Sequence, residues 1–98
     1  VGYNTKQLPV LTLWKNTDTR AQGYVTGIEP GTSYAYSTKY QRPLGLVPKI
    51  QPGETKTFDL TYRLLRNGEE VKQALAQVDK IQPGRPTELR EQPLVKLP

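Results

Sequence analysis

The apolar residues of this 98-residue chain fall mostly in short runs that polar stretches separate. These runs cover residues 8–14, 24–28, 44–50 and 58–65. A chain of this length buries only a modest fraction of its surface, so its core is marginal. We therefore expect one small domain with an ordered core around these runs and with looser ends.

The runs favour β-strands over residues 8–15, 23–29 and 57–65. Residues 57–65 alternate apolar and polar side chains, which predicts a half-buried antiparallel strand. Residues 8–15 carry apolar side chains on both faces, which is typical of a strand covered on both sides. Residues 44–50 contain Pro48 and favour a short edge strand or an extended segment.

Turn signals separate these strands. The long segment 30–42 has no clear period and predicts a loop, and loops of this length often carry function. Residues 51–55 place Pro52 and Gly53 in the middle of a turn, as a type II turn prefers.

After residue 66 the pattern becomes helical. Asn67 can cap a helix, with Glu70 three residues later in the capping-box position. Apolar residues then repeat at helical spacing, which predicts a helix over 68–80. Prolines 83, 86, 93 and 98 predict an extended tail from Gln82 onward.

Composition excludes several classes of function. The chain has no cysteine and no histidine, so a zinc site or a nucleophilic triad is not expected, and we expect no metal or other cofactor. No apolar run approaches the length of a membrane span. The net charge is +5, but the basic residues are scattered singly, which does not predict nucleic-acid binding. Nothing in the sequence indicates a cellular compartment.

Glu29 is the candidate for chemistry, because it ends an apolar stretch directly before a Pro-Gly turn. Side chains alternate along a strand, so Glu29 shares a face with Val25 and Gly27, and the glycine leaves space beside the carboxylate. Partial burial there would raise the pKa of the carboxyl group, as suits a general base. The alternative is a solvated glutamate at a strand end.

Three stretches in this order resemble the C-terminal part of the galactose mutarotase (aldose 1-epimerase) superfamily, in particular its uncharacterised aldose 1-epimerase-like branch. They are LPVLTLWKN (8–16), GYVTGIEPGT (23–32) and IQPGETKTFDLTYRLL (50–65). The resemblance implies a mainly β fold, an antiparallel β-sandwich fragment with one C-terminal helix and an extended proline-rich tail. Residues 1–66 would be the C-terminal strands of a mutarotase-like sandwich, and residues 67–98 the helix and tail.

In the family, a glutamate takes the proton from the anomeric hydroxyl of a sugar, while a histidine protonates the ring oxygen. The resemblance implies that Glu29 is this general base. Trp14, Thr32 and Tyr34 are the candidates for contact with the sugar, since a large aromatic ring can stack on a sugar face. The alternatives are a core position for Trp14 and a Tyr34 that covers the sheet. Because the chain lacks histidine, we expect it to be the C-terminal part of a longer protein and inactive alone. It also has PGTSY where mutarotases carry a Gln and later an Asp after the glutamate, which leaves open whether the sugar is epimerised or only bound.

One alternative is a stand-alone β-sandwich interaction module without catalysis, although the chain offers about four strands where such sandwiches need about seven. The apolar residues around Leu11 and Trp14 exceed what one small sheet can bury on one side. Open sheet edges and apolar patches promote self-association, so we also expect a homodimer. The expected ligand is a monosaccharide or a derivative of one.

Overall fold

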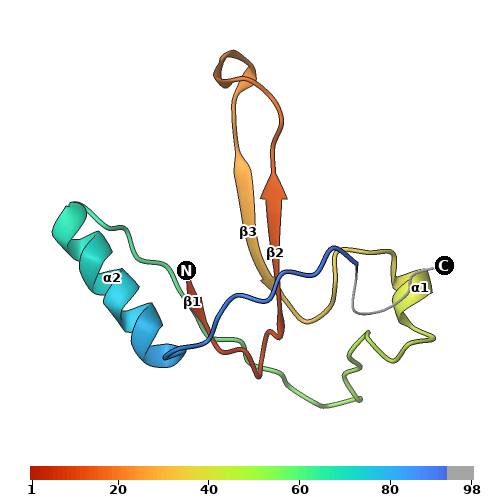
Figure 1. Cartoon of the computed structure of the whole chain (residues 1–98). Coiled ribbons are helices and arrows are strands. Elements are labelled where there is room, and N and C mark those ends of the chain that lie inside the picture. The colour runs from red at the N-terminus through yellow and green to blue at the C-terminus, as the bar shows by residue number, and fades with distance from the viewer. Residues whose placement is uncertain (93–98) are drawn as a thin grey trace. The chain divides into compact units, whose positions relative to one another are not determined.

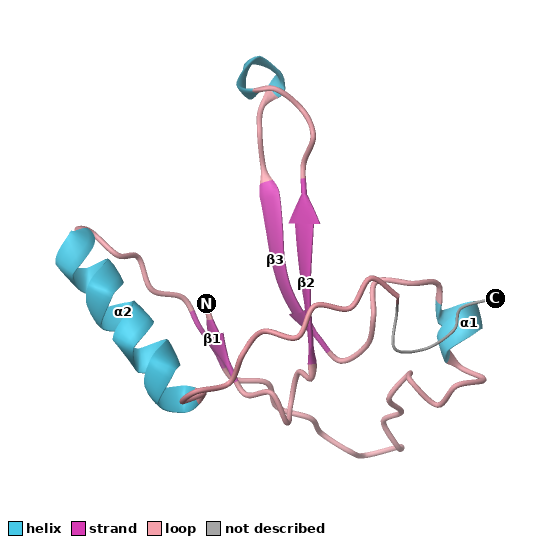
Figure 2. Cartoon of the chain, in the orientation of Figure 1, coloured by secondary structure: helices cyan, strands magenta, loops and turns pink. Residues whose placement is uncertain are grey.

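The computed structural model describes residues 1–92 and divides the chain into two units. The first unit is Val1–Tyr62, and the second begins at Arg63. The described residues form two small antiparallel sheets and one long helix, which is a small mixed fold (Figures 1 and 2). The predicted antiparallel strands and C-terminal helix are confirmed at this level, while the larger β-sandwich stays a prediction.

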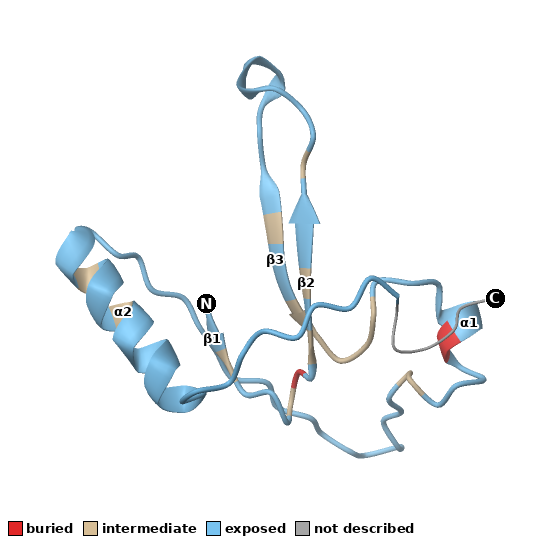
Figure 3. Cartoon of the chain, viewed as in Figure 1, coloured by how far each residue is buried: buried red, intermediate tan, exposed pale blue. Residues whose placement is uncertain are grey.

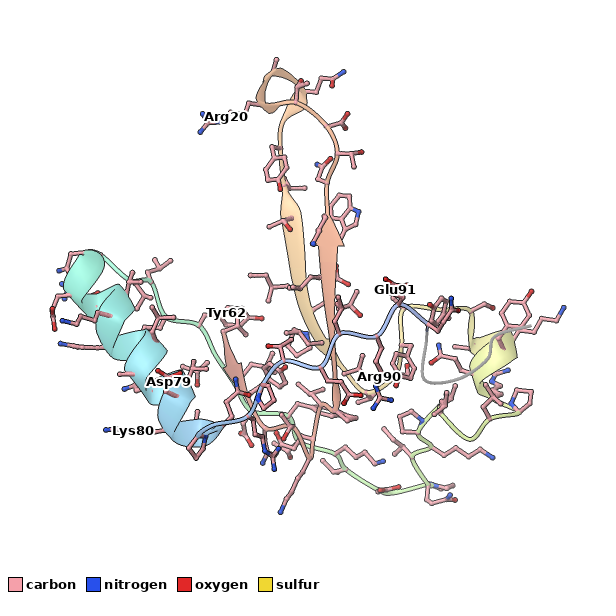
Figure 4. All side chains as sticks on the ribbon, in the orientation of Figure 1. Arg20, Tyr62, Asp79, Lys80, Arg90 and Glu91 are labelled. Carbon is pink, nitrogen blue, oxygen red and sulfur yellow. The ribbon has the colours of Figure 1, made fainter. Side chains whose placement is uncertain are left out.

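The main feature of the first unit is a β-hairpin of β2 (Val10–Lys15) and β3 (Thr26–Gly31). Its connecting loop contains a turn in which Asn16 Oδ1 accepts a hydrogen bond from Asp18 N at 2.8 Å. A 3-10 turn, η1 (Arg20–Gln22), follows and ends at Gly23, whose φ of 84° suits glycine. Arg20 projects from the tip of this loop (Figure 4).

The second sheet pairs β1 (Gly2–Tyr3) with β4 (Leu60–Thr61) in antiparallel register. The Gln7 side chain extends this connection, because its amide donates to Asp59 Oδ2 at 2.8 Å and accepts from Asp59 N at 2.9 Å. The predicted strand over 57–65 is therefore wrong in length, since only two of its residues pair. The alternating pattern predicts a strand-like face, but a strand forms only where a partner supplies hydrogen bonds.

The segments that link the strands agree with their predictions only in part. The segment 30–42 is not all loop, because β3 extends to Gly31 and a short helix, α1 (Thr38–Gln41), follows. Residues 44–50 form no strand. The turn over 51–55 is confirmed: Gly53 has a φ of 78°, and Glu54 N donates to Gln51 O at 2.9 Å.

The second unit contains helix α2 (Gly68–Ile81), which confirms the predicted helix. Asn67 Oδ1 accepts from Glu70 N at 2.9 Å, so the predicted cap is present. In a capping box the glutamate side chain would accept from the backbone N–H of Asn67. Here Glu70 accepts instead from Arg66 N at 2.8 Å and from the Arg66 guanidinium at 2.6 Å. After a turn at Gly84, the tail has no helix or strand through residue 92, and prolines 93 and 98 of the predicted tail lie outside the described residues.

Little of the described chain is buried (Figure 3). Leu8, 6% exposed, is the one buried hydrophobic residue among residues 1–92, and Gln41, 1% exposed, is the one buried polar residue. The expected covering of both faces of residues 8–15 is absent, because Leu11, Leu13 and Trp14 are each about half exposed. The hairpin has only two strands, and two strands do not provide the second layer that would cover these side chains.

Candidate functional site

The register of the hairpin places Glu29, Gly27 and Trp14 on one face. Trp14 pairs with Gly27, and Thr12 pairs with Glu29. Directly paired residues share a face of an antiparallel sheet, and so do alternate residues along one strand. Glu29 and Trp14 are therefore diagonal neighbours on this face, which we call the Glu29 face and which also carries Val10 and Thr12.

Gly27 provides the space that the Glu29 carboxylate fills. The carboxyl carbon of Glu29 lies 3.1 Å from the position that a Cβ on residue 27 would take, and Trp14 Cβ lies 3.2 Å from the same point. One carboxylate oxygen, Oε1, lies closer still. The glutamate thus folds back along its own strand toward Trp14, in the space that the sequence predicts beside a glycine.

The position of Glu29 along its strand differs from the prediction. β3 continues through Pro30 to Gly31, so Glu29 lies inside the hairpin and does not end it. Val25, predicted to share its face within the strand, precedes the paired residues. The partial burial predicted for Glu29 is wrong, because Glu29 is exposed on a two-stranded hairpin and the Trp14 side chain beside it is 50% exposed. The Glu29 face is therefore an open surface.

Tyr34 lies in a loop that the buried Gln41 side chain organises. Gln41 Oε1 accepts from Tyr34 N at 3.0 Å, and Gln41 Nε2 donates to Tyr34 O at 2.9 Å and to Tyr36 O at 2.7 Å. The first residue of α1 follows Ser37, whose hydroxyl accepts from Lys39 N. The Gln41 side chain thus supplies three of the hydrogen bonds that hold the loop after β3.

Thr32 lines a groove of about 610 Å³ in the first unit. Lys6, Gln7, Lys56 and Phe58 contribute to the same walls. The lining does not include Glu29, Trp14 or Tyr34. The structure thus brings Glu29 and Trp14 together, holds Tyr34 through Gln41, and places Thr32 in a separate groove.

Two features of this region were not expected from the sequence. Gln41 carries no pattern that distinguishes it from the other glutamines, since its role depends on the fold of its own loop. Lys6 and Lys56 are 50 residues apart in the sequence and appear there as scattered charges. The pairing of β1 with β4 and the Gln7–Asp59 contact bring their segments to one groove.

No group of three or more acidic residues within residues 1–92 is arranged to hold a metal ion. Across the same residues, none of the helices has the length and apolar character needed to cross a membrane.

Comparison with protein families gives a match over residues 1–64. Comparisons with curated proteins and with solved structures returned no match. The description of the matching family names no activity, so the resemblance to aldose 1-epimerases stays a prediction. The match covers more than half of the chain, and the chain therefore belongs to the family described as "Domain of unknown function (DUF4432)".

Proposed function

We propose that this chain is the C-terminal portion of a carbohydrate-binding, aldose 1-epimerase-like protein, and that Glu29 is its general base. One observation carries the proposal. The Glu29 carboxylate lies over Gly27 beside a half-exposed Trp14, on an open face of the hairpin. A charged acceptor next to a large aromatic surface offers a sugar two complementary contacts.

The chemistry of each contact matches a different part of a sugar. The indole ring presents an apolar surface to the C–H groups of a pyranose ring. The carboxylate accepts hydrogen bonds from hydroxyl groups, and a carboxylate in that position can remove the proton of an anomeric hydroxyl. Ring opening then requires an acid at the ring oxygen, and in this proposal a segment outside this chain supplies it.

Thr32 and Tyr34 would act at the far end of β3 in this proposal. Thr32 lines the separate groove and not the Glu29 face, so in this proposal it contacts another unit of the ligand. Gln41 supports this role for the loop by fixing the backbone of Tyr34.

The opposite face of the hairpin supports the proposed sandwich. It carries Leu11, Leu13 and Ile28, which are 45%, 55% and 51% exposed. Apolar side chains gathered on one face of a hairpin are typical of a face that a second layer covers. In the proposed parent, further strands cover this face and leave the Glu29 face toward the sugar.

The test compares anomer exchange by this chain and by a longer parent chain, followed by polarimetry or NMR with several aldoses. We expect the parent to catalyse exchange and this chain not to exceed the buffer rate, since the loss of one acid/base group costs about 10² to 10⁴ in rate. Glu29→Gln in the parent should abolish catalysis without unfolding the protein. Glu54→Gln is the matched control, because Glu54 is the turn carboxylate that accepts from Gln51 N. A fully active Glu29→Gln parent would refute the proposed role.

A stand-alone interaction module remains the second candidate, and the exposed apolar face of the hairpin favours it. It predicts binding of a protein partner through Leu11, Leu13 and Ile28, with no dependence on Glu29.

A further inference from the structure

We infer that the groove lined by Lys6, Thr32, Lys56 and Phe58 binds the anionic group of a small ligand, and that the ligand is a sugar bearing a phosphate or a carboxylate. The identification of the ligand as a sugar rests on the proposed function, and because neither Glu29 nor Trp14 lines the groove, this sugar unit is separate from the one at the Glu29 face. The anionic site itself rests on the groove alone.

The backbone around Lys6 is fixed by a turn. Asn4 Oδ1 accepts from Lys6 N at 2.9 Å, and Asn4 O accepts from Gln7 N and Leu8 N at 3.0 and 2.9 Å. Leu8, directly after this turn, is the buried apolar anchor of the unit. Lys6, which contributes to the lining of the groove, therefore lies on a backbone that hydrogen bonds hold in place.

Gln7 joins the segment that carries Lys6 to the segment that carries Lys56 and Phe58. Its side-chain amide makes two hydrogen bonds to Asp59, at 2.8 and 2.9 Å, and this fixes the segment that carries Lys56 and Phe58. The two lysines thus belong to segments that are connected by hydrogen bonds. The groove that they help to line, about 610 Å³, is within the usual size range of small-molecule sites.

The groove is lined by two positively charged side chains and by no negatively charged one. Neither Lys6 nor Lys56 forms an ion pair within residues 1–92, and no acidic residue contributes to the lining. Asp59, the acidic residue next to Phe58, points one carboxylate oxygen at the Gln7 amide. Two lysines and the hydroxyl of Thr32 are donors suited to the oxygens of a phosphate or carboxylate.

The groove also has apolar lining residues, so a well-matched ligand needs an apolar surface as well as a negative charge. Phe58, Pro9 and Ile50 give the groove this hydrophobic surface. A bare inorganic ion would leave this surface unused, whereas the ring of a sugar would cover it. A compact ring with one oxyanion satisfies both parts of the lining, which is why we choose an acidic sugar over a neutral one.

The experiment titrates the ¹⁵N-labelled chain with glucose 6-phosphate, glucuronate, glucose and inorganic phosphate, and follows amide shifts by NMR. We expect the two acidic sugars to shift the amides of residues 6, 32 and 56–58, more weakly as salt is added, because screening reduces the attraction of exposed charges. Lys6→Gln and Lys56→Gln should each weaken binding about tenfold, the usual effect of losing one charged hydrogen bond. Lys72→Gln, the same charge change on α2, should have no effect.

The outcomes separate this inference from the proposed function. Equal binding of glucose and glucose 6-phosphate, unaffected by either lysine substitution, would overturn the anionic site and leave the sugar function standing. Lysine-dependent binding of inorganic phosphate with no gain from any sugar would support the anionic site and count against the sugar. Absence of shifts with all four probes would overturn the inference.

Discussion

Substitution of Gln41 by leucine tests how the loop after β3 is held. The glutamine is 1% exposed and makes three hydrogen bonds to the backbone of Tyr34 and Tyr36. Leucine is close to it in size and removes all three bonds. Tyr34 O keeps a partner, because Tyr36 N donates to it at 2.8 Å. Two backbone groups, Tyr34 N and Tyr36 O, lose theirs.

The cost follows from these two groups. A buried polar group left without a partner costs about 1–3 kcal/mol. The low end of that range applies here, because the neighbouring residues are partly exposed and water reaches them. Two groups then cost roughly 2 kcal/mol in local stability, which corresponds to about a 30-fold change in an opening equilibrium.

Hydrogen exchange measured by NMR reports this opening directly at the Tyr34 amide, because that amide donates to Gln41. We expect its exchange to be about 30-fold faster in Gln41→Leu, a change that follows from local stability. Gln22→Leu is the control, since the Gln22 side chain accepts one long bond of 3.3 Å on the exposed hairpin loop. Unchanged exchange at Tyr34 in Gln41→Leu would refute the claim that this amide holds the loop.

Three further predictions concern the second unit and self-association. Asn67→Ala should destabilise α2 by about 1 kcal/mol, because it removes the side-chain oxygen that accepts from Glu70 N. Far-UV circular dichroism should show a loss of helicity, and unchanged helicity would contradict a stabilising role for this cap. Hydrogen bonds from the Arg66 side chain and backbone hold the pKa of Glu70 below its usual range. Its stabilising effect is therefore complete above the ordinary glutamate pKa of about 4.3 and is lost as the pH falls through the lowered pKa. An acid titration should show α2 losing more helicity in the wild type than in Glu70→Gln, and identical titrations would contradict this. Sedimentation should detect a homodimer at high protein concentration. Leu13→Lys should weaken this dimer, because Leu13 lies on the exposed apolar face of the hairpin. A monomer at all concentrations would refute the prediction of a dimer.

The elements with local causes could be predicted from the sequence. Asn67 and Glu70 mark the start of α2, and Pro52-Gly53 marks a turn, because each acts through hydrogen bonds within a few residues. The space over Gly27 was predictable for the same reason, since alternation alone puts Glu29 beside it.

Features that depend on distant partners could not be predicted. The alternation over residues 57–65 indicates a strand, yet only Leu60–Thr61 pair, because β1 offers two residues as a partner. The extension of β3 past Glu29 follows from its pairing with Val10 and Leu11, which includes Pro30 and Gly31 despite their turn-forming character. The groove of Lys6 and Lys56 likewise arises from contacts across 52 residues.

The central claim, that the Glu29 face binds a sugar, can be tested most directly at Trp14. The chain has one tryptophan, so its indole N–H gives a single NMR signal and its fluorescence a single source. Titration of the chain with an aldose should shift that signal and change that emission, and Glu29→Gln should weaken the response about tenfold, as expected for the loss of a charged hydrogen bond. An indole signal that stays unchanged at saturating sugar, or a response that is identical in Glu29→Gln, would contradict the account.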